Sequence, residues 1–266
     1  MKRAKALWLG VAIVAIGAFL LSTTAPLSSQ QGLTVNIDHN DIGGVVSSAK
    51  GSEAGVWVIA ETTDLPTRFA RMVVTDDQGR YVLPDLPKGS YSVWVRGYGL
   101  IDSPKVKAMP GKNLNLKAVV APNDAAAAQF YPAIYWYSML KIPEASEFGG
   151  KGAIPAKVTQ TEWLNSMKNN GCIGCHQLGQ LSTRTFPKDV PHPLGKFNTS
   201  QEAWFRRIQS GQSGESMFNT LVNQLGAVPF KYFADWTDRI AKGELPHTKP
   251  TRPQGVERNI VVTTWD

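Results

Sequence analysis

Between residues 33 and 122 the chain alternates short apolar runs with turn-forming residues. The runs are rich in β-branched and aromatic side chains, and in the last of them Tyr91, Val93 and Val95 fall on one face of an extended strand. The run Asp76-Asp77-Gln78-Gly79 is the clearest turn. About seven short strands over this length predict a small antiparallel β-sandwich, which we place at residues 31–122. The clearest strands are expected at 42–47, 56–62, 69–75 and 91–95.

From residue 157 onward the apolar positions recur at helical spacing. Trp163 and Met167 lie about one helical turn apart. Thr199 or Ser200 is placed to cap a second helix, and Gly243 to end a third. We therefore predict a multidomain fold, in which the all-β sandwich is followed by an all-α domain at 157–248. The expected helices cover 159–170, 201–208 and 230–241.

Residues 123–156 have the composition of a linker between these two domains. The segment begins with an alanine-rich stretch at 124–128, for which we expect a short helix, and it contains flexible glycines at 149–152. Between them lies a strongly aromatic run at 131–137. This run has two interpretations, packing between the domains and a docking face. We favour packing, because so many rings are seldom left in water.

Residues 1–30 have the order of a secretory signal. Lys2, Arg3 and Lys5 come first, an apolar run at 6–21 follows, and small and polar residues come next. The run is shorter than the about 20 residues of a spanning helix, so we favour a cleaved signal over a retained membrane anchor. The protein is therefore expected to be exported, most simply to the periplasm.

The net charge argues against a nucleic-acid partner. It is +7 for the whole chain and falls to +4 when the three cations of the signal are removed. No single element carries a stripe of lysine and arginine, which a nucleic-acid-binding protein usually shows. A mild basic excess is still able to steer an acidic redox partner.

Two cysteines, the only ones in the chain, lie in the run Cys172-Ile173-Gly174-Cys175-His176. In an exported chain this spacing indicates attachment of a c-type haem. Each thiol forms a thioether with one haem vinyl group, and His176 is then held below the iron as the proximal ligand. A thioredoxin-like pair would need a β-α-β context, and a zinc site would need a second pair of ligands at suitable spacing. We therefore expect one covalent haem c.

The surroundings of this motif resemble the class I cytochrome c family. The run 192–195 is similar to the family's Gly-Pro-x-Leu-x-Gly loop, although His192 stands in place of the leading glycine. The resemblance implies that the carbonyl of Pro193 accepts a hydrogen bond from the proximal imidazole. It also implies that Met217 is the sixth iron ligand, which favours ferrous iron and raises the potential. Phe218 stands where the family usually has a proline.

Other residues compete for places around the haem. His192 and an open position are the alternatives to Met217 at the sixth site. Arg206 and Arg207 are either solvated on an exposed helix face or paired with the haem propionates, and we favour solvation. Five aromatic residues are candidates for the hydrophobic wall of the haem pocket or for plain helix packing: Trp163, Trp204, Phe205, Tyr232 and Trp236.

The β region resembles a second family, the carboxypeptidase regulatory-like domain. The resemblance rests on Gly79-Arg80-Tyr81-Val82-Leu83 and Leu86-Pro87-Lys88-Gly89-Ser90-Tyr91-Ser92-Val93. It implies a transthyretin-like sandwich, related to carbohydrate-binding-like folds. Gly79 and Gly89 are expected where hairpins need a positive φ. Trp57 and Trp94 either stack on a glycan or pack in the core, and we favour the core.

These features lead to three functional hypotheses. The first is a mono-haem electron-transfer cytochrome with a β-sandwich accessory domain and a separate redox partner protein. The second is the electron-transfer part of a larger periplasmic enzyme, an oxidoreductase or lyase with a β-propeller as its adjoining catalytic domain. It treats 249–266 as the start of a further, possibly truncated segment, and we favour this interpretation over the alternative, a C-terminal strand that pairs within this chain. The third is a carbohydrate-binding module with a haem sensor. We find no self-contained enzyme site.

Overall fold

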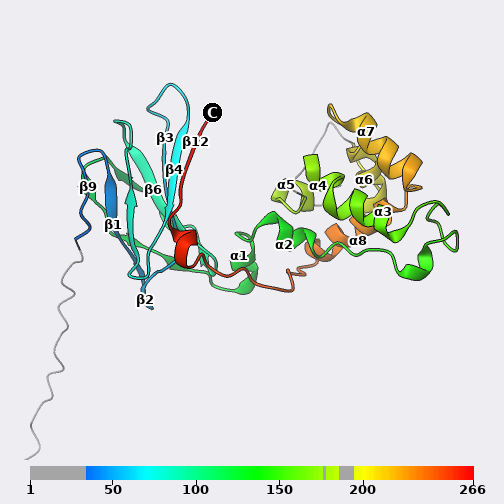
Figure 1. Ribbon diagram of the computed structural model, residues 1–266, viewed down its shortest axis with the longest axis horizontal. Helices are drawn as coiled ribbons and strands as arrows, with labels where there is room; N and C mark the ends of the chain where they lie inside the picture. The colour runs from blue at the N-terminus through cyan, green and yellow to red at the C-terminus, as the bar shows by residue number, and fades with distance from the viewer. Residues whose placement is uncertain (1–33, 176–177, 186–194) are drawn as a thin grey trace, which may run out of the picture. The chain divides into compact units, whose positions relative to one another are not determined.

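The computed structural model describes residues 34–175, 178–185 and 195–266. The expected signal at 1–30 and the predicted haem-site residues His176 and Pro193 lie outside these ranges, as does the alternative ligand His192. Strands and helices can be followed by label in Figure 1. Within the described ranges, every helix is too short or too polar to span a bilayer.

The two-sheet part is formed by residues 42–120 together with the C-terminal strand at 261–265. It consists of two five-stranded sheets and a two-stranded ribbon. The first sheet is built around β1 and contains β1 (Ile42–Ser48), β2 (Gly51–Ser52), β5 (Arg80–Leu83), β9 (Lys112–Asn113) and β10 (Leu116–Lys117). The second has the order β12-β4-β3-β6-β8, with β3 (Trp57–Thr62), β4 (Phe69–Val74), β6 (Tyr91–Arg96), β8 (Val106–Ala108) and β12 (Val261–Trp265). The ribbon pairs β7 (Leu100–Ile101) with β11 (Val119–Val120).

The first sheet is not purely antiparallel, although the sequence predicts an antiparallel sandwich. The second sheet is antiparallel throughout. In the first sheet, however, β1 runs parallel to both β9 and β10. These two strands hold only two residues each, and they lie more than sixty residues after β1. Their direction therefore depends on a long-range return of the chain, which local alternation does not specify.

The two sheets share one hydrophobic core. Ile42 and Leu83 come from the first sheet, and Val58, Tyr91 and Val93 come from the second; all five lie in the same buried cluster. Full burial of such a side chain contributes about 1.5–3 kcal/mol. The predicted inward face of β6 is confirmed, because Tyr91, Val93 and Val95 are fully buried.

The turns differ in which residue takes the left-handed conformation. The predicted turn at 76–79 is present, and Gly79 has the expected positive φ of 74°. Gly89, for which a positive φ is also expected, does not have one. In the turn before it, Asp85 has a positive φ of 50°. Aspartate tolerates this region better than most side chains. The Asp85 amide also donates a 3.0 Å hydrogen bond to the Asp41 carboxylate.

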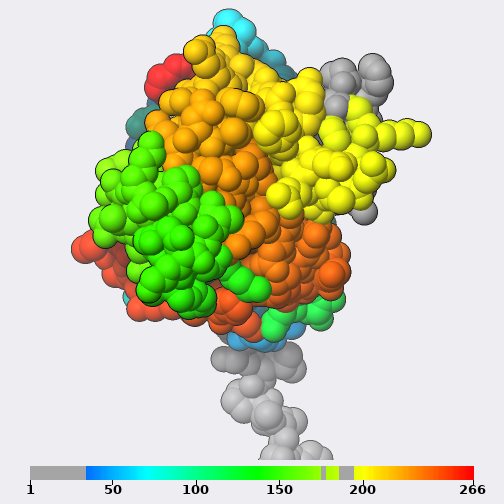
Figure 2. Space-filling model, turned by 90° about the vertical axis from the view of Figure 1, so that its right-hand side faces the viewer, coloured from blue at the N-terminus to red at the C-terminus, as the bar shows by residue number. Residues whose placement is uncertain are grey.

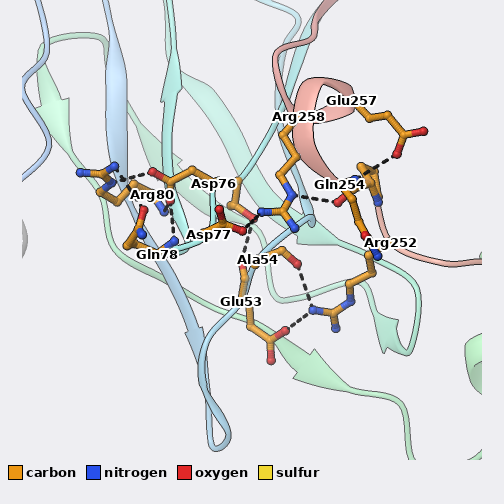
Figure 3. A network of polar contacts seen from close by, with 12 residues as sticks. Glu53, Ala54, Asp76, Asp77, Gln78, Arg80, Arg252, Gln254, Glu257 and Arg258 are labelled. Atoms are coloured by element: carbon orange, nitrogen blue, oxygen red, sulfur yellow. Dashed lines mark hydrogen bonds and ion pairs between the residues drawn. The ribbon is translucent and has the colours of Figure 1, made fainter.

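The C-terminal strand completes the second sheet. β12 is the edge strand and pairs with β4 from Val261 to Trp265, so the strand-like end of the chain pairs within the chain. Figure 3 shows the polar contacts that lead into this strand. The Arg252 guanidinium bonds the Glu53 carboxylate at 2.5 Å and the Tyr98 carbonyl at 3.0 Å, and Arg258 pairs with Asp77.

We expect the replacement of Arg252 by glutamine to destabilise the two-sheet part by about 1–3 kcal/mol, since Glu53 would lose its counter-charge while staying buried. The Glu53 side chain is only 7% exposed. The midpoint of urea denaturation measures the effect. Lys249→Gln is the matched control, because the Lys249–Asp124 pair is exposed on both sides. Equal midpoints for both variants would show that the buried pair does not stabilise the fold.

The described helices lie between the ribbon and the C-terminal strand. Thr199 caps α6 by accepting a hydrogen bond from the Glu202 amide, and Thr159 caps α3 in the same way through Glu162. The described helices are α1 (Asp124–Ala128), α2 (Ala133–Tyr137), α3 (Gln160–Leu164), α4 (Cys172–Cys175), α5 (Leu181–Arg184), α6 (Ser200–Arg207), α7 (Gly214–Phe218) and α8 (Pro229–Ala241). π-Helical turns cover Asn165–Asn169 and Asn219–Gln224, and 3₁₀ turns cover Ala145–Glu147 and Gly255–Arg258.

The segment expected as a linker forms part of the helical core. Trp136 and Tyr137 are almost fully buried, in one cluster with Trp163, Phe230 and Trp236. Their large apolar rings favour burial over a solvent-exposed connection. Figure 2 shows connector residues, in green, lying against the orange α8 region. There Glu147 accepts hydrogen bonds from Lys231 (2.8 Å) and Tyr232 (2.7 Å). These two donors hold the pKa of Glu147 at about 2.

Candidate haem-attachment site

The cysteine motif begins directly after a close turn of the backbone. The π-helical turn Asn165–Asn169 ends there, and the amide of Gly171 bonds the carbonyl of Asn165 at 3.1 Å. A Cβ atom at Gly171 would overlap the carbonyl oxygen of Ser166. Glycine is therefore required at this position for the chain to leave one helix and begin α4 with Cys172.

The motif's first cysteine packs on the helical core. Cys172 and Ile173 are partly buried against the cluster that contains Tyr137. Burial, with a smaller contribution from the charge of Cys172, raises the pKa of Tyr137. The Tyr137 hydroxyl donates a hydrogen bond to the carbonyl of Met167. This bond fixes the orientation of the ring in the cluster on which Cys172 packs. Cys175 is the last residue of α4, while its side chain and all of His176 lie outside the described part.

Met217 packs on the same core from a different helix. It lies in α7, where its amide bonds the carbonyl of Ser213 at 2.9 Å, and its side chain is partly buried against the same cluster as Cys172. The structure thus brings two sulfur-bearing predicted site residues, far apart in sequence, onto one hydrophobic core. Pro193 is outside the described residues, so its predicted hydrogen bond stays a prediction.

Both sulfur positions adjoin π-helical turns. Asn165–Asn169 comes just before the cysteine motif, and Asn219–Gln224 follows Met217 in the next helical turn. π-Turns are rare and are found preferentially at functional sites. Each turn buries one apolar side chain, Met167 in the first and Leu221 in the second.

Four of the five candidate wall residues pack in the helical cluster. Trp163, Trp204 and Trp236 are buried in it, and Tyr232 packs against it with its ring 5.8 Å from that of Trp163. Phe205 differs: it is 40% exposed. Its ring nevertheless lies 6.0 Å from Phe218 and 5.4 Å from Phe230, so it borders the residue that follows Met217.

Sequence reasoning missed Lys168, which lies in the π-helical turn before the motif. Its ammonium donates to the carbonyl of Tyr137 at 3.0 Å and lies 4.5 Å from the centre of the Tyr137 ring. Burial lowers the pKa of Lys168 to about 8. The dense aromatic run at 131–137 indicates that aromatic rings pack together here. It does not indicate that the ammonium of Lys168 lies against one of them.

The donor set fits a c-type haem. Two thiols at both ends of one helical turn suit two thioether bonds, and an imidazole with a thioether sulfur suits haem iron. The described donors, Cys172 and Met217, both rest on a core of aromatic and aliphatic side chains, which is the surrounding that an apolar macrocycle needs.

The two tryptophans of the β region give little support for a glycan site. Trp94 is 7% exposed, and the Lys105 ammonium lies 4.0 Å above its ring. Trp57 packs edge-on against Tyr98, with ring centres 4.9 Å apart. Neither ring belongs to the buried cluster of the two sheets, so the expected position in that core is not found. Trp57 also borders a cavity of about 390 Å³ beside Pro253.

Comparison with known proteins does not assign a family. No protein-family model and no curated protein matches the chain. Among solved structures, it is similar to a chain in the crystal structure of an N-terminal interface mutant of a type II cohesin–X-dockerin complex from Acetivibrio cellulolyticus. The two are 16% identical, and the match covers 35% of this chain and 66% of that chain with a TM-score of 0.26. A likeness of this size carries no functional argument.

Proposed function

We propose that this protein is an exported mono-haem c-type cytochrome that transfers electrons, with the two-sheet part as an accessory domain. One observation carries the proposal: the Cys-x-x-Cys-His motif begins on a helix that packs on the same hydrophobic core as Met217. In this proposal Cys172 and Cys175 hold the haem by thioethers, and His176 and Met217 are the axial ligands.

The bound haem supplies a reversible ferric–ferrous couple. The chain's own residues would hold the haem in place, favour its reduced form and exclude water from its surroundings. The cysteines fix its position on α4, and the thioether of Met217 favours the reduced form. The buried rings of Trp163, Trp204 and Trp236 exclude water from the surroundings of the cofactor, which raises the potential and limits reorganisation on electron transfer. No group in this scheme abstracts a proton or attacks a substrate.

The finer fold assignment belongs to the same proposal. The order of the cysteine motif, Met217 and a closing helix α8 resembles that of class I cytochromes c. The two-sheet part resembles the transthyretin-like sandwich of carboxypeptidase regulatory-like domains. The partner that we propose is a periplasmic redox protein or an adjoining catalytic domain, reached through the exposed side of the helical part.

Replacement of Met217 by alanine tests the axial ligand. We expect the oxidised protein to lose the weak long-wavelength absorption band of methionine-ligated ferric haem, and the reduction potential to fall, because the thioether no longer stabilises ferrous iron. Optical spectra and a redox titration measure both changes in protein produced with a c-haem maturation system.

Two methionine variants serve as controls. Met109→Ala changes an exposed residue of the β region, and Met167→Leu changes a buried one with its volume nearly conserved. Both should keep the band. If the band were absent from the wild type, a bis-histidine iron with His192 or an open sixth position would replace the proposed ligation. A band that persisted in Met217→Ala would show that a different methionine is the ligand.

A further inference from the structure

Arg184, at the end of α5, is a buried cation with neutral partners. The residue is only 6% exposed. Its guanidinium donates to the carbonyl of Gly179 at 2.8 Å and to the side-chain oxygen of Gln129 at 3.2 Å. It also lies 4.1 Å from the centre of the Trp136 ring. None of these three groups carries a negative charge.

Arg207, at the end of α6, is half-buried, and its partners are also neutral. Its Nη2 donates to the carbonyl of Ser182, and the guanidinium lies 5.2 Å from the centre of the Trp204 ring. Its Nη1 is buried and has no hydrogen-bond partner. Burial lowers the pKa of both guanidinium groups. Among the ion pairs of the described residues, neither Arg184 nor Arg207 takes part.

Both cations lie around α5, just beyond the haem motif. Arg184 is the last residue of this helix, and Arg207 reaches its backbone at Ser182. Gly179, which accepts from Arg184, comes three positions after His176 in the sequence. Arginine keeps its charge in proteins, and a buried charge is unfavourable unless it is paired. The buried Arg184 and the buried Nη1 of the half-buried Arg207 therefore favour anions at this place.

We propose that Arg184 and Arg207 bind the two propionate carboxylates of the haem attached at Cys172 and Cys175. The inference rests on the proposed function. Two propionates balance two guanidinium charges, and arginine matches a carboxylate with two parallel hydrogen bonds. Arg206 is the contrasting neighbour: its Nη1 donates to the hydroxyl of Ser210 at 2.8 Å, and none of its nitrogens is among the buried atoms of the described residues that have no partner. The alternative counter-charge is Asp189, which lies outside the described residues.

The test is the pH dependence of the reduction potential of the holoprotein. In the wild type the arginines keep both propionates ionised, so the potential should be flat from about pH 5 to about pH 8. In Arg184→Gln and Arg207→Gln the propionate pKa rises. The potential at high pH should then fall below that of the wild type, because an uncompensated carboxylate stabilises ferric iron. It should also decline as pH rises through the new pKa.

Three comparisons decide the outcome. Arg206→Gln should behave as the wild type, and Arg207→Lys, which keeps the charge, should restore most of the flat profile. An NMR titration of the propionates in the wild type gives the same information without any variant, and pKa values near those of free carboxylates would overturn the proposal. A profile in Asp189→Asn that matches the two glutamine variants would overturn it as well. Absence of covalent haem from the wild type would instead refute the proposed function itself.

Discussion

Replacing Cys172 and Cys175 by alanine is expected to abolish covalent haem attachment completely. The motif supplies the chain's only thiols, so no other residue is able to form a thioether with the haem vinyl groups. Without those bonds the haem would be held only by axial ligands and apolar contact. The measurement is a haem-stained denaturing gel, supported by the mass of the intact protein, after expression with a c-haem maturation system.

The matched control lies inside the same motif. Beyond its chain neighbours and its own helix, a Cβ atom at Gly174 would meet no atom of the described residues within 4 Å, so Gly174→Ala changes the motif's interior without a clash with them. This variant should retain its haem at the wild-type level. Covalent haem that persisted in the double alanine variant would contradict the assignment. Loss of haem in Gly174→Ala as well would show that the attachment machinery reads more than the cysteines and histidine.

The central strands of the β region could be predicted from sequence because each one buries a regular face. The runs at 56–62, 69–75 and 91–95 correspond to β3, β4 and β6 with shifts of one residue. The strands of two or three residues carry too few side chains for any alternation to be visible. Their pairing depends on partners far along the chain, and such long-range contacts leave no local pattern.

The strand with which the C-terminal strand pairs could not be predicted from the sequence. Val261 and Val262 indicate an extended strand, but both are substantially exposed at the edge of the sheet. The position of β12 beside β4 is set by backbone pairing and by the arginines that precede it, Arg252 and Arg258. A charged residue before a strand has no visible preference for one sheet edge until the fold places Glu53 and Asp77 nearby.

The candidate site shows the same division between local and long-range information. The haem motif is a local signal, so it could be identified from five consecutive residues. Arg184 gave no such signal, because its sequence surroundings are those of a short polar helix. Its burial depends on Trp136 and Gln129, which belong to the segment that we expected to be a linker. From the sequence we favour solvation for both Arg206 and Arg207. The structure fits this expectation better for Arg206, because Nη1 of Arg207 is buried.

Trp236 is the residue whose truncation should most weaken the helical part. The side chain is fully buried, and its ring lies 5.8 Å from that of Tyr137 and 6.4 Å from that of Trp204. Its indole nitrogen donates to the carbonyl of Trp136 at 2.9 Å. We expect Trp236→Ala to cost about 3–5 kcal/mol in the free energy of unfolding, because it creates a large cavity and removes the side-chain hydrogen bond to that carbonyl.

Urea denaturation followed by the helical circular dichroism signal measures this cost, with Trp265→Ala as the control. Trp265 is 67% exposed on β12, so its loss should change stability by less than about 0.5 kcal/mol. Similar costs for the two variants would mean that the helical core is not held by this ring. The expected difference has a functional consequence: Trp236 supports Tyr137, which packs in the cluster below Cys172. Trp236→Ala should therefore also lower the yield of haem-loaded protein, whereas Trp265→Ala should not.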